Sequence, residues 1–472
     1  MRILFATSEA RPLIKTGGLA DVSGALPAAL RAIGLDCRVL LPGYPAVLAG
    51  VETATPLCAL SGLPGETEAR LLEASMPDNG VPLYILDAPA LFQRPGGPYQ
   101  DVAGHDHPDN ALRFAVFSKV AAILASSDSP LEWRPDLLHC NDWQTGLAPA
   151  YLRLSGQATP SIMTVHNLAY QGVFPRATVS LAGLPQESFA IDGVEYYGSL
   201  SFLKAGLFYA DRLTTVSPSY AKEIRGPALG MGMQGLLGTR GADLVGILNG
   251  IDTGEWDPNA DPHLPYKFSE RATAGKQRCK IKLQQDLNLA PEKEAPLFGV
   301  IARLAHQKGL DLILAVADGI LHRGGQIALL GTGEKALEAA FRDLGALHPG
   351  HVAAVIGYDE GLSHRIEAGS DIFLMPSRFE PCGLNQLYSL RYGTVPVVHA
   401  TGGLKDTVED GVTGFVFEEP TAHALWLAVD RALRAYADKK TWQRMMRAAM
   451  SRDFSWEKSA REYETLYRSL LD

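Results

Sequence analysis

The sequence predicts an α/β protein made of two doubly wound, Rossmann-like domains that face a deep cleft. Short apolar runs alternate with helical patterns along most of the chain, which is typical of parallel sheets covered by helices. The chain of 472 residues exceeds the size at which one hydrophobic core usually stops growing, so we expect two domains. Residues 249–296 interrupt the alternation, because they are rich in Asp, Pro, Lys and Gln and hold few candidate strands.

The composition predicts a soluble globular protein, with 46% hydrophobic and 20% charged residues. A net charge of −9 argues against non-specific binding to nucleic acid. No apolar stretch approaches the ~20 residues that span a membrane, and Glu9 and Arg11 interrupt the first apolar run too early for a signal peptide. Five scattered cysteines without a C-x-x-C pair indicate reduced thiols. We therefore expect a cytoplasmic protein that binds neither membranes nor nucleic acid, and no pattern predicts its oligomeric state.

The first half of the chain opens with a buried strand at residues 3–6 and a helix at 22–33, whose alanine content and apolar spacing favour helix. Later apolar runs and helical spacings continue the alternation. They predict strands at 37–41, 83–86, 137–140, 161–165 and 212–216, and helices at 111–124 and 200–209.

The second half begins with a charged helix at 278–289, after which a new alternation starts. It predicts strands at 296–302, 326–330, 352–356, 372–375 and 395–399, and helices at 310–321, 385–392 and 456–471. We therefore expect domains at residues 1–248 and 249–453, followed by a C-terminal helix at 454–472.

The segment Lys15-Thr-Gly-Gly-Leu-Ala-Asp21 lies where the first strand turns into the first helix. Gly17 and Gly18 let the backbone approach a ligand closely, and a helix N-terminus offers N–H groups and positive dipole charge. Lys15 adds a full positive charge for a phosphate. A turn that only packs the helix on the strand fits the local sequence equally well.

Polar side chains follow two further predicted strands. Asp142 and Trp143 come after the strand at 137–140, and His166 and Asn167 follow the strand at 161–165. An indole face suits a sugar ring, and the polar groups suit its hydroxyls. For each residue alone a packing role is favoured, with Asp142 capping the next helix and Trp143 lying in the core.

Arg303 and Lys308 lie in one loop, directly after the strand at 296–302. Ligands of such sheets bind beyond the carboxyl ends of the strands. The two cations can converge on a diphosphate, Arg through two parallel hydrogen bonds and Lys as a point charge. We favour this interpretation over a solvated loop face.

Two glycine-containing turns complete the candidate site. Glu380-Pro-Cys-Gly-Leu384 opens a helix, and Thr401-Gly-Gly-Leu404 follows the strand at 395–399. Their N–H groups could bind a phosphate, and Glu380 could hold sugar hydroxyls. Cys382 is interpreted as a small packed residue, because nothing in the sequence places a base beside it. No catalytic triad, H-E-x-x-H or Walker A pattern appears.

Taken together, these motifs resemble those of bacterial glycogen synthases, the ADP-glucose-using α-1,4-glucan synthase family that includes plant starch synthases. The resemblance runs nearly end to end, and its motifs are highly specific as a set. They are Lys15-Thr-Gly-Gly-Leu-Ala-Asp21-Val22, Pro42-Gly-Tyr-Pro45, Pro108-Asp-Asn110 with Arg113-Phe114, Asn141-Asp-Trp143, Thr164-Val-His-Asn-Leu-Ala-Tyr-Gln-Gly172, Asn249-Gly-Ile-Asp252, Arg303 with Lys308-Gly309, Gly331-Thr-Gly333, Glu380-Pro-Cys-Gly-Leu384 and Thr401-Gly-Gly-Leu404.

The resemblance implies a retaining glycosyltransferase of the GT-B fold that acts in glycogen biosynthesis. It would transfer glucose from ADP-glucose to the non-reducing end of glycogen or another α-1,4-glucan and release ADP. The N-terminal domain would lie on the acceptor side, the C-terminal domain would hold the donor, and the last helix would cross back to the N-terminal domain. The family needs no metal, and no cofactor is expected.

The resemblance also implies roles for individual residues. Arg303, Lys308, Lys15 and backbone donors near Gly18 and Leu404 would stabilise the departing diphosphate. His166 and Glu380 would hold glucose hydroxyls, and Tyr358 would stack on the adenine. The implied catalytic residues are Arg303, Lys308, Glu380 and His166, and the implied substrate-binding residues are Lys15, Gly17, Gly18, Asp21, Asp142, Asn167, Tyr358, Cys382, Gly383, Leu384, Thr401, Gly402, Gly403 and Leu404.

Two segments depart from the family pattern. Tyr388 stands where many related transferases carry a second glutamate, and residues 229–236 are more apolar than expected for what we interpret as a flexible cleft loop. Two other functions are left open, namely another sugar-nucleotide transferase or epimerase on the same plan and a non-catalytic glucan-binding protein. The intact set of Lys15, Arg303, Lys308 and Glu380 weighs against the second, because a binder has no need for diphosphate cations.

Overall fold

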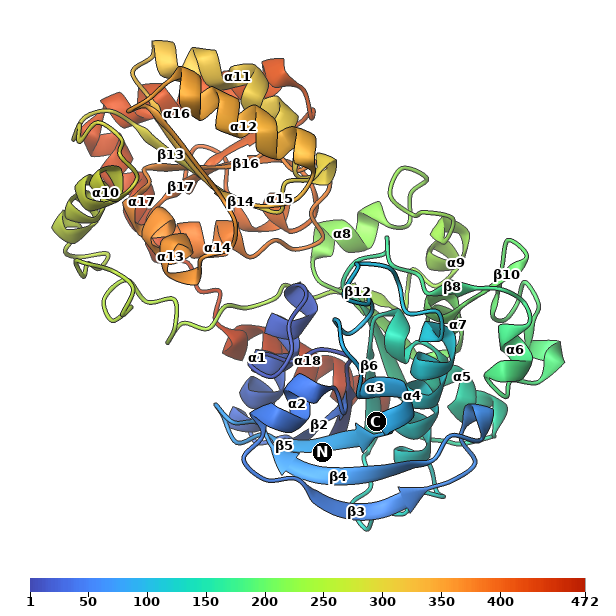
Figure 1. Ribbon diagram of the computed structural model, residues 1–472. Helices are drawn as coiled ribbons and strands as arrows, with labels where there is room; N and C mark the ends of the chain where they lie inside the picture. Colours follow the sequence, from blue (N-terminus) through green and yellow to red (C-terminus); the bar gives the residue numbers. More distant parts are fainter. Residues whose placement is uncertain (472) are drawn as a thin grey trace. The chain divides into compact units, whose positions relative to one another are not determined.

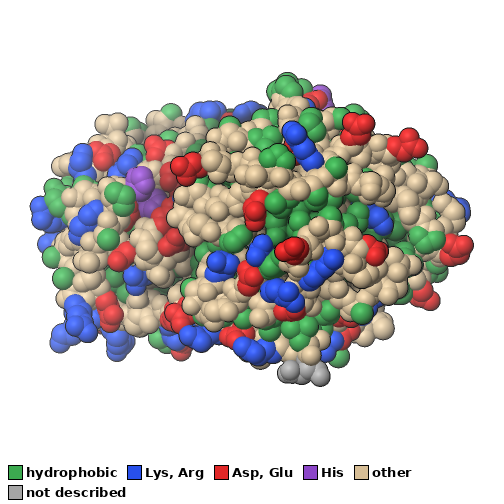
Figure 2. Space-filling view, turned by 90° about the horizontal axis from the view of Figure 1, so that it is seen from below, with side chains coloured by type: hydrophobic (Ala, Val, Ile, Leu, Met, Phe, Trp, Pro, Cys, Tyr) green, Lys and Arg blue, Asp and Glu red, His purple; other side chains and the backbone are tan. Residues whose placement is uncertain are grey.

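The computed structural model describes residues 1–471, which fold into two compact units (Figure 1). The first unit comprises residues 1–250 and helix α18 (Trp456–Leu471), and the second comprises residues 251–455. Each unit has its own parallel sheet and its own apolar core, which confirms the predicted fold class. Acidic and basic side chains are interspersed over the face shown in Figure 2. Among the described residues, no helix has the length and apolar character that crossing a membrane requires.

The main sheet of the first unit has nine strands in the order β12-β11-β7-β6-β1-β2-β5-β4-β3. Strands β12 to β5 run parallel, and β4 and β3 add an antiparallel edge. The strands are β1 (Arg2–Ala6), β2 (Asp36–Pro42), β3 (Thr55–Leu60), β4 (Ala69–Ser75), β5 (Pro82–Asp87), β6 (Leu137–Asn141), β7 (Ser161–Val165), β11 (Arg212–Thr215) and β12 (Leu244–Gly246). The strands predicted for this half are all present, with their ends within one residue. The prediction missed β3, β4 and β12 of this sheet, because these strands are partly or mostly exposed and lack a long continuous apolar run.

The helices of the first unit correct three predicted boundaries. Helix α1 begins at Gly18 and not at Val22, so the glycine-rich turn runs into its first turn. Residues 199–201 form strand β10 of a small sheet in the order β8-β10-β9, so helix α7 begins only at Phe202. Helix α9 takes up the end of the expected loop at 229–236. The elements are α1 (Gly18–Ala32), α2 (Pro45–Gly50), α3 (Pro89–Phe92), α4 (Asn110–Leu124), α5 (Leu147–Leu154), α6 (Thr178–Leu181), α7 (Phe202–Tyr209), α8 (Pro218–Glu223) and α9 (Gln234–Thr239), with β8 (Val173–Phe174), β9 (Glu195–Tyr196) and β10 (Ser199–Ser201).

Helix α18 is part of the first unit although it closes the sequence. It packs against α1 and buries the rings of Tyr463 and Tyr467. The Tyr467 hydroxyl lies 2.8 Å from His139 Nδ1 on β6, and Ser459 Oγ donates to the Leu248 carbonyl at 2.7 Å. These contacts fix the C-terminal helix on the sheet that carries β6 and β7.

The sheet of the second unit is fully parallel, in the order β15-β14-β13-β16-β17-β18. In Figure 1, α11, α12 and α16 lie on one side of its strands and α13 and α14 on the other. The strands are β13 (Leu297–Ile301), β14 (Gln326–Gly331), β15 (Val352–Ile356), β16 (Ile372–Met375), β17 (Val395–His399) and β18 (Phe415–Phe417). The predicted strands of this half agree within one residue, and the short β18 was missed.

One predicted helix of the second unit has shifted bounds. Helix α10 runs from Ala274 to Asp286, whereas the prediction was 278–289. It ends because Asn288 adopts a left-handed φ of 56°. In its first turn, Gly275 packs on the backbone of Lys267, where a Cβ would lie 2.0 Å from the carbonyl oxygen. The other helices are α11 (Leu310–His322), α12 (Lys335–Leu347), α13 (Glu360–Gly369), α14 (Asn385–Arg391), α15 (Gly402–Thr407), α16 (Ala422–Ala437) and α17 (Lys439–Met450).

Candidate active site

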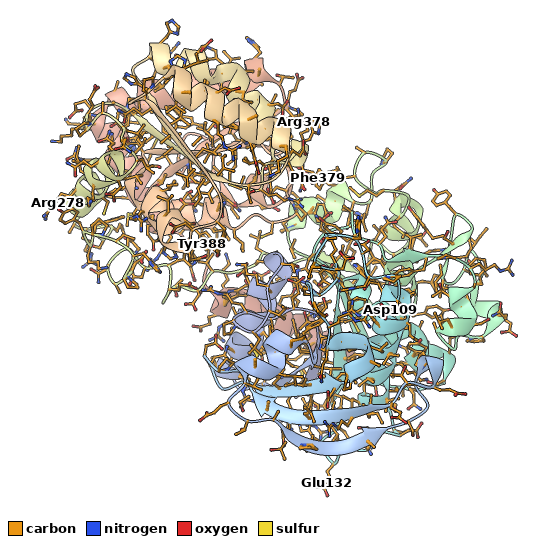
Figure 3. The ribbon with its side chains drawn as sticks, in the orientation of Figure 1. Asp109, Glu132, Arg278, Arg378, Phe379 and Tyr388 are labelled. Carbon is orange, nitrogen blue, oxygen red and sulfur yellow. The ribbon has the colours of Figure 1, made fainter. Side chains whose placement is uncertain are left out.

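The predicted residues of the second unit gather at the carboxyl ends of three neighbouring strands. The loop after β13 carries Arg303 and Lys308, the loop after β16 carries Glu380, and the turn after β17 begins at Thr401. Strands β13, β16 and β17 are adjacent in the sheet, so these loops lie at the same edge, where ligands of α/β sheets bind. Figure 3 labels two residues of the β16 loop, Arg378 and Phe379.

Lys308 and Glu380 form an ion pair at this edge. Lys308 Nζ donates to Glu380 Oε2 at 2.6 Å, and Ser377 Oγ donates to the same oxygen at 3.0 Å. The side chains are 22% and 8% exposed, respectively. Charges that are shielded from water in this way attract each other more strongly than charges on the surface. The site therefore holds an ammonium group and a carboxylate side by side.

Arg303 is exposed, and hydrogen bonds that the sequence did not predict connect its loop to the loop after β16. Its guanidinium donates to Gln307 Oε1 at 3.3 Å, and Gln307 Nε2 donates to the Phe379 carbonyl at 3.2 Å. Arg378 grips Asp311 through two hydrogen bonds of 2.8 and 2.7 Å. These bonds tie the β13 loop to the β16 loop. Only the position of these residues near strand ends could have indicated their role from the sequence, because Gln, Arg and Asp are common on protein surfaces.

Gly402 and Gly403 allow two loops to pack backbone against backbone. Gly402 has a φ of 44°, and a Cβ there would lie 1.9 Å from the Glu380 carbonyl oxygen. A Cβ at Gly403 would lie 2.1 Å from the Cys382 carbonyl oxygen, and the Gly403 N–H donates to the Glu380 carbonyl at 3.2 Å. The glycines therefore position Glu380, and this N–H group is bonded within the protein.

The remaining residues of the two turns are packed or bonded locally. Cys382 is 4% exposed, which fits a packed residue. Gly383 adopts a left-handed φ of 74°, and Leu384 precedes the first residue of α14. The Leu404 N–H donates to the Thr401 carbonyl at 3.1 Å, so it serves the first turn of α15.

Tyr358 follows β15 and is separated from the cations by strand β14. Its side chain is 78% exposed, and its hydroxyl bonds the carboxylate of Glu360. An exposed aromatic ring at a strand end can stack on a flat ring of a ligand.

In the first unit, the turn at 15–21 is organised by Glu9, a residue that the sequence analysis missed. Glu9 is 3% exposed. Its carboxylate accepts the Thr16 N–H at 2.5 Å, the Gly17 N–H at 3.2 Å and the Tyr99 hydroxyl at 2.5 Å. A carboxylate of the chain itself thus occupies two of the turn's backbone N–H groups, which fixes the shape of the turn.

Lys15 lies beside open space at this turn. Its Nζ pairs with Asp21 Oδ1 at 2.7 Å, and its side chain is 43% exposed. Apart from the neighbouring residues and the backbone of α1 itself, no heavy atom of residues 1–471 lies within 4 Å of the position that a Cβ would take at Gly17 or at Gly18. The turn therefore leaves room for a ligand to approach the backbone at the start of α1.

Asn141, Asp142 and His166 form a buried network at the ends of β6 and β7. Asp142 Oδ1 accepts the His166 N–H at 2.7 Å, and His166 Nε2 lies 2.9 Å from Asn141 Oδ1. Asn141 Nδ2 donates to the Ala6 carbonyl at 3.0 Å, which directs Oδ1 toward the imidazole. In the neutral ring Nε2 then carries the proton, and Nδ1 is left as a hydrogen-bond acceptor.

The structure decides both packing alternatives for the segment after β6. Asp142 has a φ of 54° and no capping hydrogen bond to the following turn, so the capping interpretation is wrong. Trp143 packs edge-on against Phe114 at 4.9 Å, and a Cβ at Gly172 would lie 2.4 Å from its ring. Trp143 is therefore partly buried and packs against the core of the first unit.

Burial sets the protonation of the network. It raises the pKa of Asp142 to about 7, although the N–H groups of His166 and Asn167 stabilise the carboxylate. Burial also lowers the pKa of His166 to about 3, because the charged ring loses its water. At neutral pH the His166 ring is therefore uncharged and can accept a hydrogen bond at Nδ1.

We expect the buried His139 to make the folded protein less stable in acid. Burial and the nearby His166 lower its pKa to about 3, so the unfolded chain binds the proton more readily than the folded one below pH 6.5. Relative to His139→Asn, the wild type should lose about 3 kcal/mol of unfolding free energy between pH 6.5 and 4. Urea titrations at several pH values measure this. The raised pKa of Asp142 has the opposite effect on the unfolding free energy, but it acts equally in the wild type and in His139→Asn, so it cancels in the comparison. The control variant His105→Asn replaces an exposed histidine, and its unfolding free energy should depend on pH as that of the wild type does.

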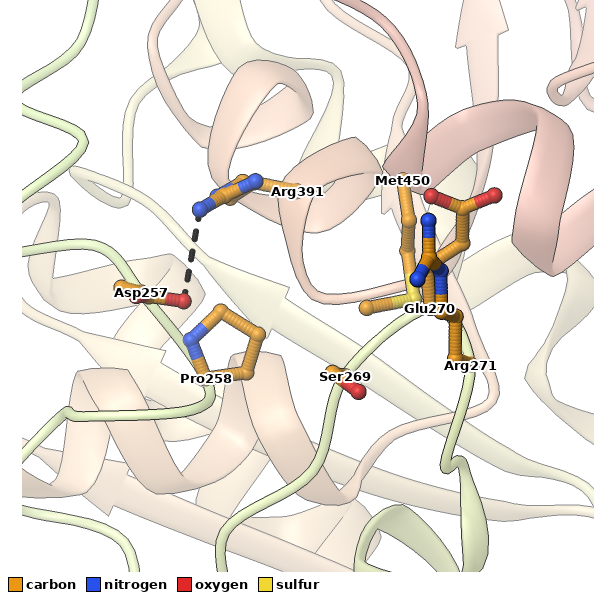
Figure 4. A pocket seen from close by; sticks show the side chains of 7 residues that line it. All are labelled: Asp257, Pro258, Ser269, Glu270, Arg271, Arg391 and Met450. Atoms are coloured by element: carbon orange, nitrogen blue, oxygen red, sulfur yellow. Dashed lines mark hydrogen bonds and ion pairs between the residues drawn. The ribbon is translucent and has the colours of Figure 1, made fainter.

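A pocket of the second unit lies away from these strand ends (Figure 4). At its margin Arg391 bonds Asp257 at 3.3 Å. Arg391 is the last residue of α14, whereas Asn385, the first, donates to the Ile301 carbonyl at the end of β13. The pocket therefore lies at the end of α14 that is opposite to the candidate site. It is lined by Asp257, Pro258, Ser269, Glu270, Arg271, Arg391 and Met450.

Comparison with known proteins covers both units. The starch synthase catalytic domain family matches residues 2–239, and the glycosyl transferases group 1 family matches residues 283–451. The chain is 54% identical to a glycogen synthase of Paramagnetospirillum magneticum and 51% identical to one of Nitrosospira multiformis, covering all of this chain and 98% and 97% of theirs. The catalytic domain of starch synthase IV from Arabidopsis thaliana, bound to ADP and acarbose, is 32% identical with a TM-score of 0.89 over 100% of this chain and 99% of that chain. A sucrose-phosphate synthase from Thermosynechococcus elongatus shares the fold, with a TM-score of 0.62 at 19% identity over 99% and 98% of the two chains.

Proposed function

The chain belongs to the glycogen synthase family, and from this premise we propose that it transfers glucose from ADP-glucose to the non-reducing end of an α-1,4-glucan. It is a glycosyltransferase of the GT-B fold. In the proposed reaction the anomeric configuration is retained and ADP is released. The observation that carries the proposal is the Lys308–Glu380 ion pair beside Arg303, because it supplies cations for a diphosphate and a carboxylate for sugar hydroxyls at one sheet edge.

The two cations are proposed to act on the leaving group. As the bond between the anomeric carbon and the phosphate oxygen breaks, negative charge grows on the diphosphate and positive charge grows on the sugar ring. Arg303 and Lys308 would stabilise the first charge, and this interaction strengthens in the transition state. The acceptor hydroxyl attacks the anomeric carbon and gives its proton to the departing phosphate. Lys15 stays a predicted phosphate ligand.

The sugar and the base would contact different residues. Glu380 would accept hydrogen bonds from glucose hydroxyls, and neutral His166 would accept one at Nδ1. The Asp142 carboxylate accepts the N–H groups of His166 and Asn167 and so holds the segment that carries His166. The exposed ring of Tyr358 would stack on the adenine. ADP and acarbose in the Arabidopsis relative support a nucleotide donor and a glucan acceptor for this chain.

Incorporation of labelled glucose tests the proposal. Purified protein with glycogen should move label from ADP-[14C]glucose into the polymer, and faster than from UDP-[14C]glucose. Because β-amylase removes maltose from non-reducing ends of α-1,4-glucans, it should release the new label as maltose. Release of ADP without polymer growth would contradict the proposed acceptor, and a folded protein without turnover would support a binding protein. Faster incorporation from UDP-glucose would contradict the proposed donor.

A further inference from the structure

We propose that the second unit holds a binding site for a divalent transition-metal ion, formed by Glu255, Glu360 and His364. One ligand atom from each side chain lies within 4.8 Å of the other two. The proposed glucosyl transfer assigns no role to these three residues, although the Tyr358 hydroxyl bonds Glu360.

Two separate parts of the unit supply the ligands. Glu360 and His364 stand four residues apart on α13, and this spacing places their side chains on the same face of a helix. Glu255 comes from the loop before Trp256, where its N–H donates to Asp252 Oδ1 at 3.1 Å. The Glu360 side chain is 37% exposed, whereas His364 is fully buried. An ion can therefore enter from the carboxylate side and meet the imidazole at the closed end.

The imidazole of His364 already has the orientation of a metal ligand. Its Nδ1 donates to Asp261 Oδ2 at 2.7 Å, so in the neutral ring the lone pair lies on Nε2. Nε2 lies 3.7 Å from Glu360 Oε1, beyond hydrogen-bonding distance, and it is a buried atom without a hydrogen-bond partner among residues 1–471. A carboxylate on one ring nitrogen and the metal on the other is the usual surrounding of a metal-bound histidine.

The residues around His364 hold this orientation. Asp261 also accepts the Tyr392 hydroxyl at 2.5 Å and the His263 N–H at 2.8 Å. The ring of Trp256 stacks on the imidazole at 3.8 Å with an angle of 12° between the planes. The stack prevents the imidazole from turning Nε2 away from the two carboxylates, so the ligand is pre-organised.

The donor set selects the class of metal. One imidazole nitrogen and two carboxylates suit Zn²⁺ and related first-row ions, whereas Mg²⁺ and Ca²⁺ prefer oxygen ligands alone. A bound ion would join the loop around Glu255 to α13 and so stabilise the second unit. The imidazole of His364 faces Asp261, Glu255, Glu360 and the ring of His263, and the Tyr358 hydroxyl bonds Glu360. Burial disfavours the charged ring, but the carboxylates of Asp261 and Glu360 outweigh it and raise the pKa of His364 to about 9. A bound ion must therefore displace a proton from the ring at pH 8, and its affinity should rise with pH.

Calorimetric titration of the full-length protein with ZnCl₂, after chelator treatment, tests the proposal. The wild type should bind one Zn²⁺ that Glu255→Gln and Glu360→Gln each weaken at least tenfold, and Asp261→Asn should weaken it by about 10- to 100-fold. MgCl₂ should give no comparable binding. His322→Gln is the matched control, because it removes an exposed histidine of the same unit.

Thermal unfolding gives a second measurement. Zn²⁺ should raise the Tm of the wild type and of His322→Gln, but not that of Glu255→Gln. Glu255 lies in a partly exposed loop, so this variant keeps the buried His364 and its stack intact. Equal Zn²⁺ affinity and equal Tm shifts in the wild type and Glu255→Gln would overturn the proposal, as would the absence of Zn²⁺ binding to the wild type.

Discussion

Arg303→Ala and Lys308→Ala should each lower the turnover of glucosyl transfer by about 10²-fold or more while the fold stays intact. Both cations lie in the loop after β13, where the leaving diphosphate is proposed to bind. Their interaction grows with the charge on the leaving group, so kcat should fall and not only the affinity for the donor. Steady-state kinetics with ADP-glucose measure the effect.

Lys308→Ala should have a further consequence, because Lys308 pairs with the nearly buried Glu380 at 2.6 Å. Without the ammonium group, the carboxylate keeps the Ser377 hydroxyl as a neighbour but loses its charge partner, so the Glu380 side chain should be held less firmly than in Arg303→Ala.

Matched controls separate these effects from a general loss of charge. Lys282→Ala and Arg323→Ala remove cations of the same unit that pair with Asp286 and Asp430 on the surface. Both variants should keep near-normal turnover. Near-normal turnover of both Arg303→Ala and Lys308→Ala would rule out the leaving-group assignment.

Gly402→Ala should lower turnover by about 10²-fold, because it displaces the loop that carries Glu380. A Cβ at Gly402 would lie 1.9 Å from the Glu380 carbonyl oxygen, which is part of the backbone and cannot rotate away. The two loops must separate, and Glu380 moves with them. Kinetics, together with calorimetric binding of ADP, would report the displaced site.

Gly411→Ala is the matched control for this variant. Gly411 has a left-handed φ of 72°, as Gly402 has one of 44°, but in the described part of the chain no heavy atom beyond its two chain neighbours lies within 4 Å of a Cβ at Gly411. Both substitutions should cost about 1 kcal/mol through backbone strain. Only Gly402→Ala should lose turnover, and equal kinetics of the two variants would show that the loop contact does not position the site.

Tyr388, which stands where many related transferases carry a second glutamate, has a role in packing. Its ring stacks on Trp256 at 3.6 Å with 10° between the planes, and Figure 3 labels it on α14. A glutamate at this position would lose the stacking contact. Tyr388 and His364 therefore both stack on Trp256 and belong to the same group of packed rings.

Most strands and several helix ends could be predicted because they depend on neighbouring residues. The run at 161–165 is buried throughout and forms β7 with the predicted ends, since a strand buried on both faces needs no strict polar alternation. Helix α1 was less accurate, because Gly17 and Gly18 have low helix propensity and hide the true start at Gly18. Tertiary packing overrides such local preferences.

By itself, the sequence determined the fold class, the strand-end positions of Arg303, Lys308, Glu380 and His166, and the family resemblance. Hydrophobic periodicity and short motifs are local properties, so they can be read without knowing which strands are neighbours. Only the tertiary structure decided which of these residues touch. Lys308 pairs with Glu380, Glu9 takes the N–H groups of the Lys15 turn, and Asp261 orients His364, in each case across a fold that brings distant segments together. Burial, which sets the protonation of Asp142 and His166, likewise exists only once the chain has packed around them.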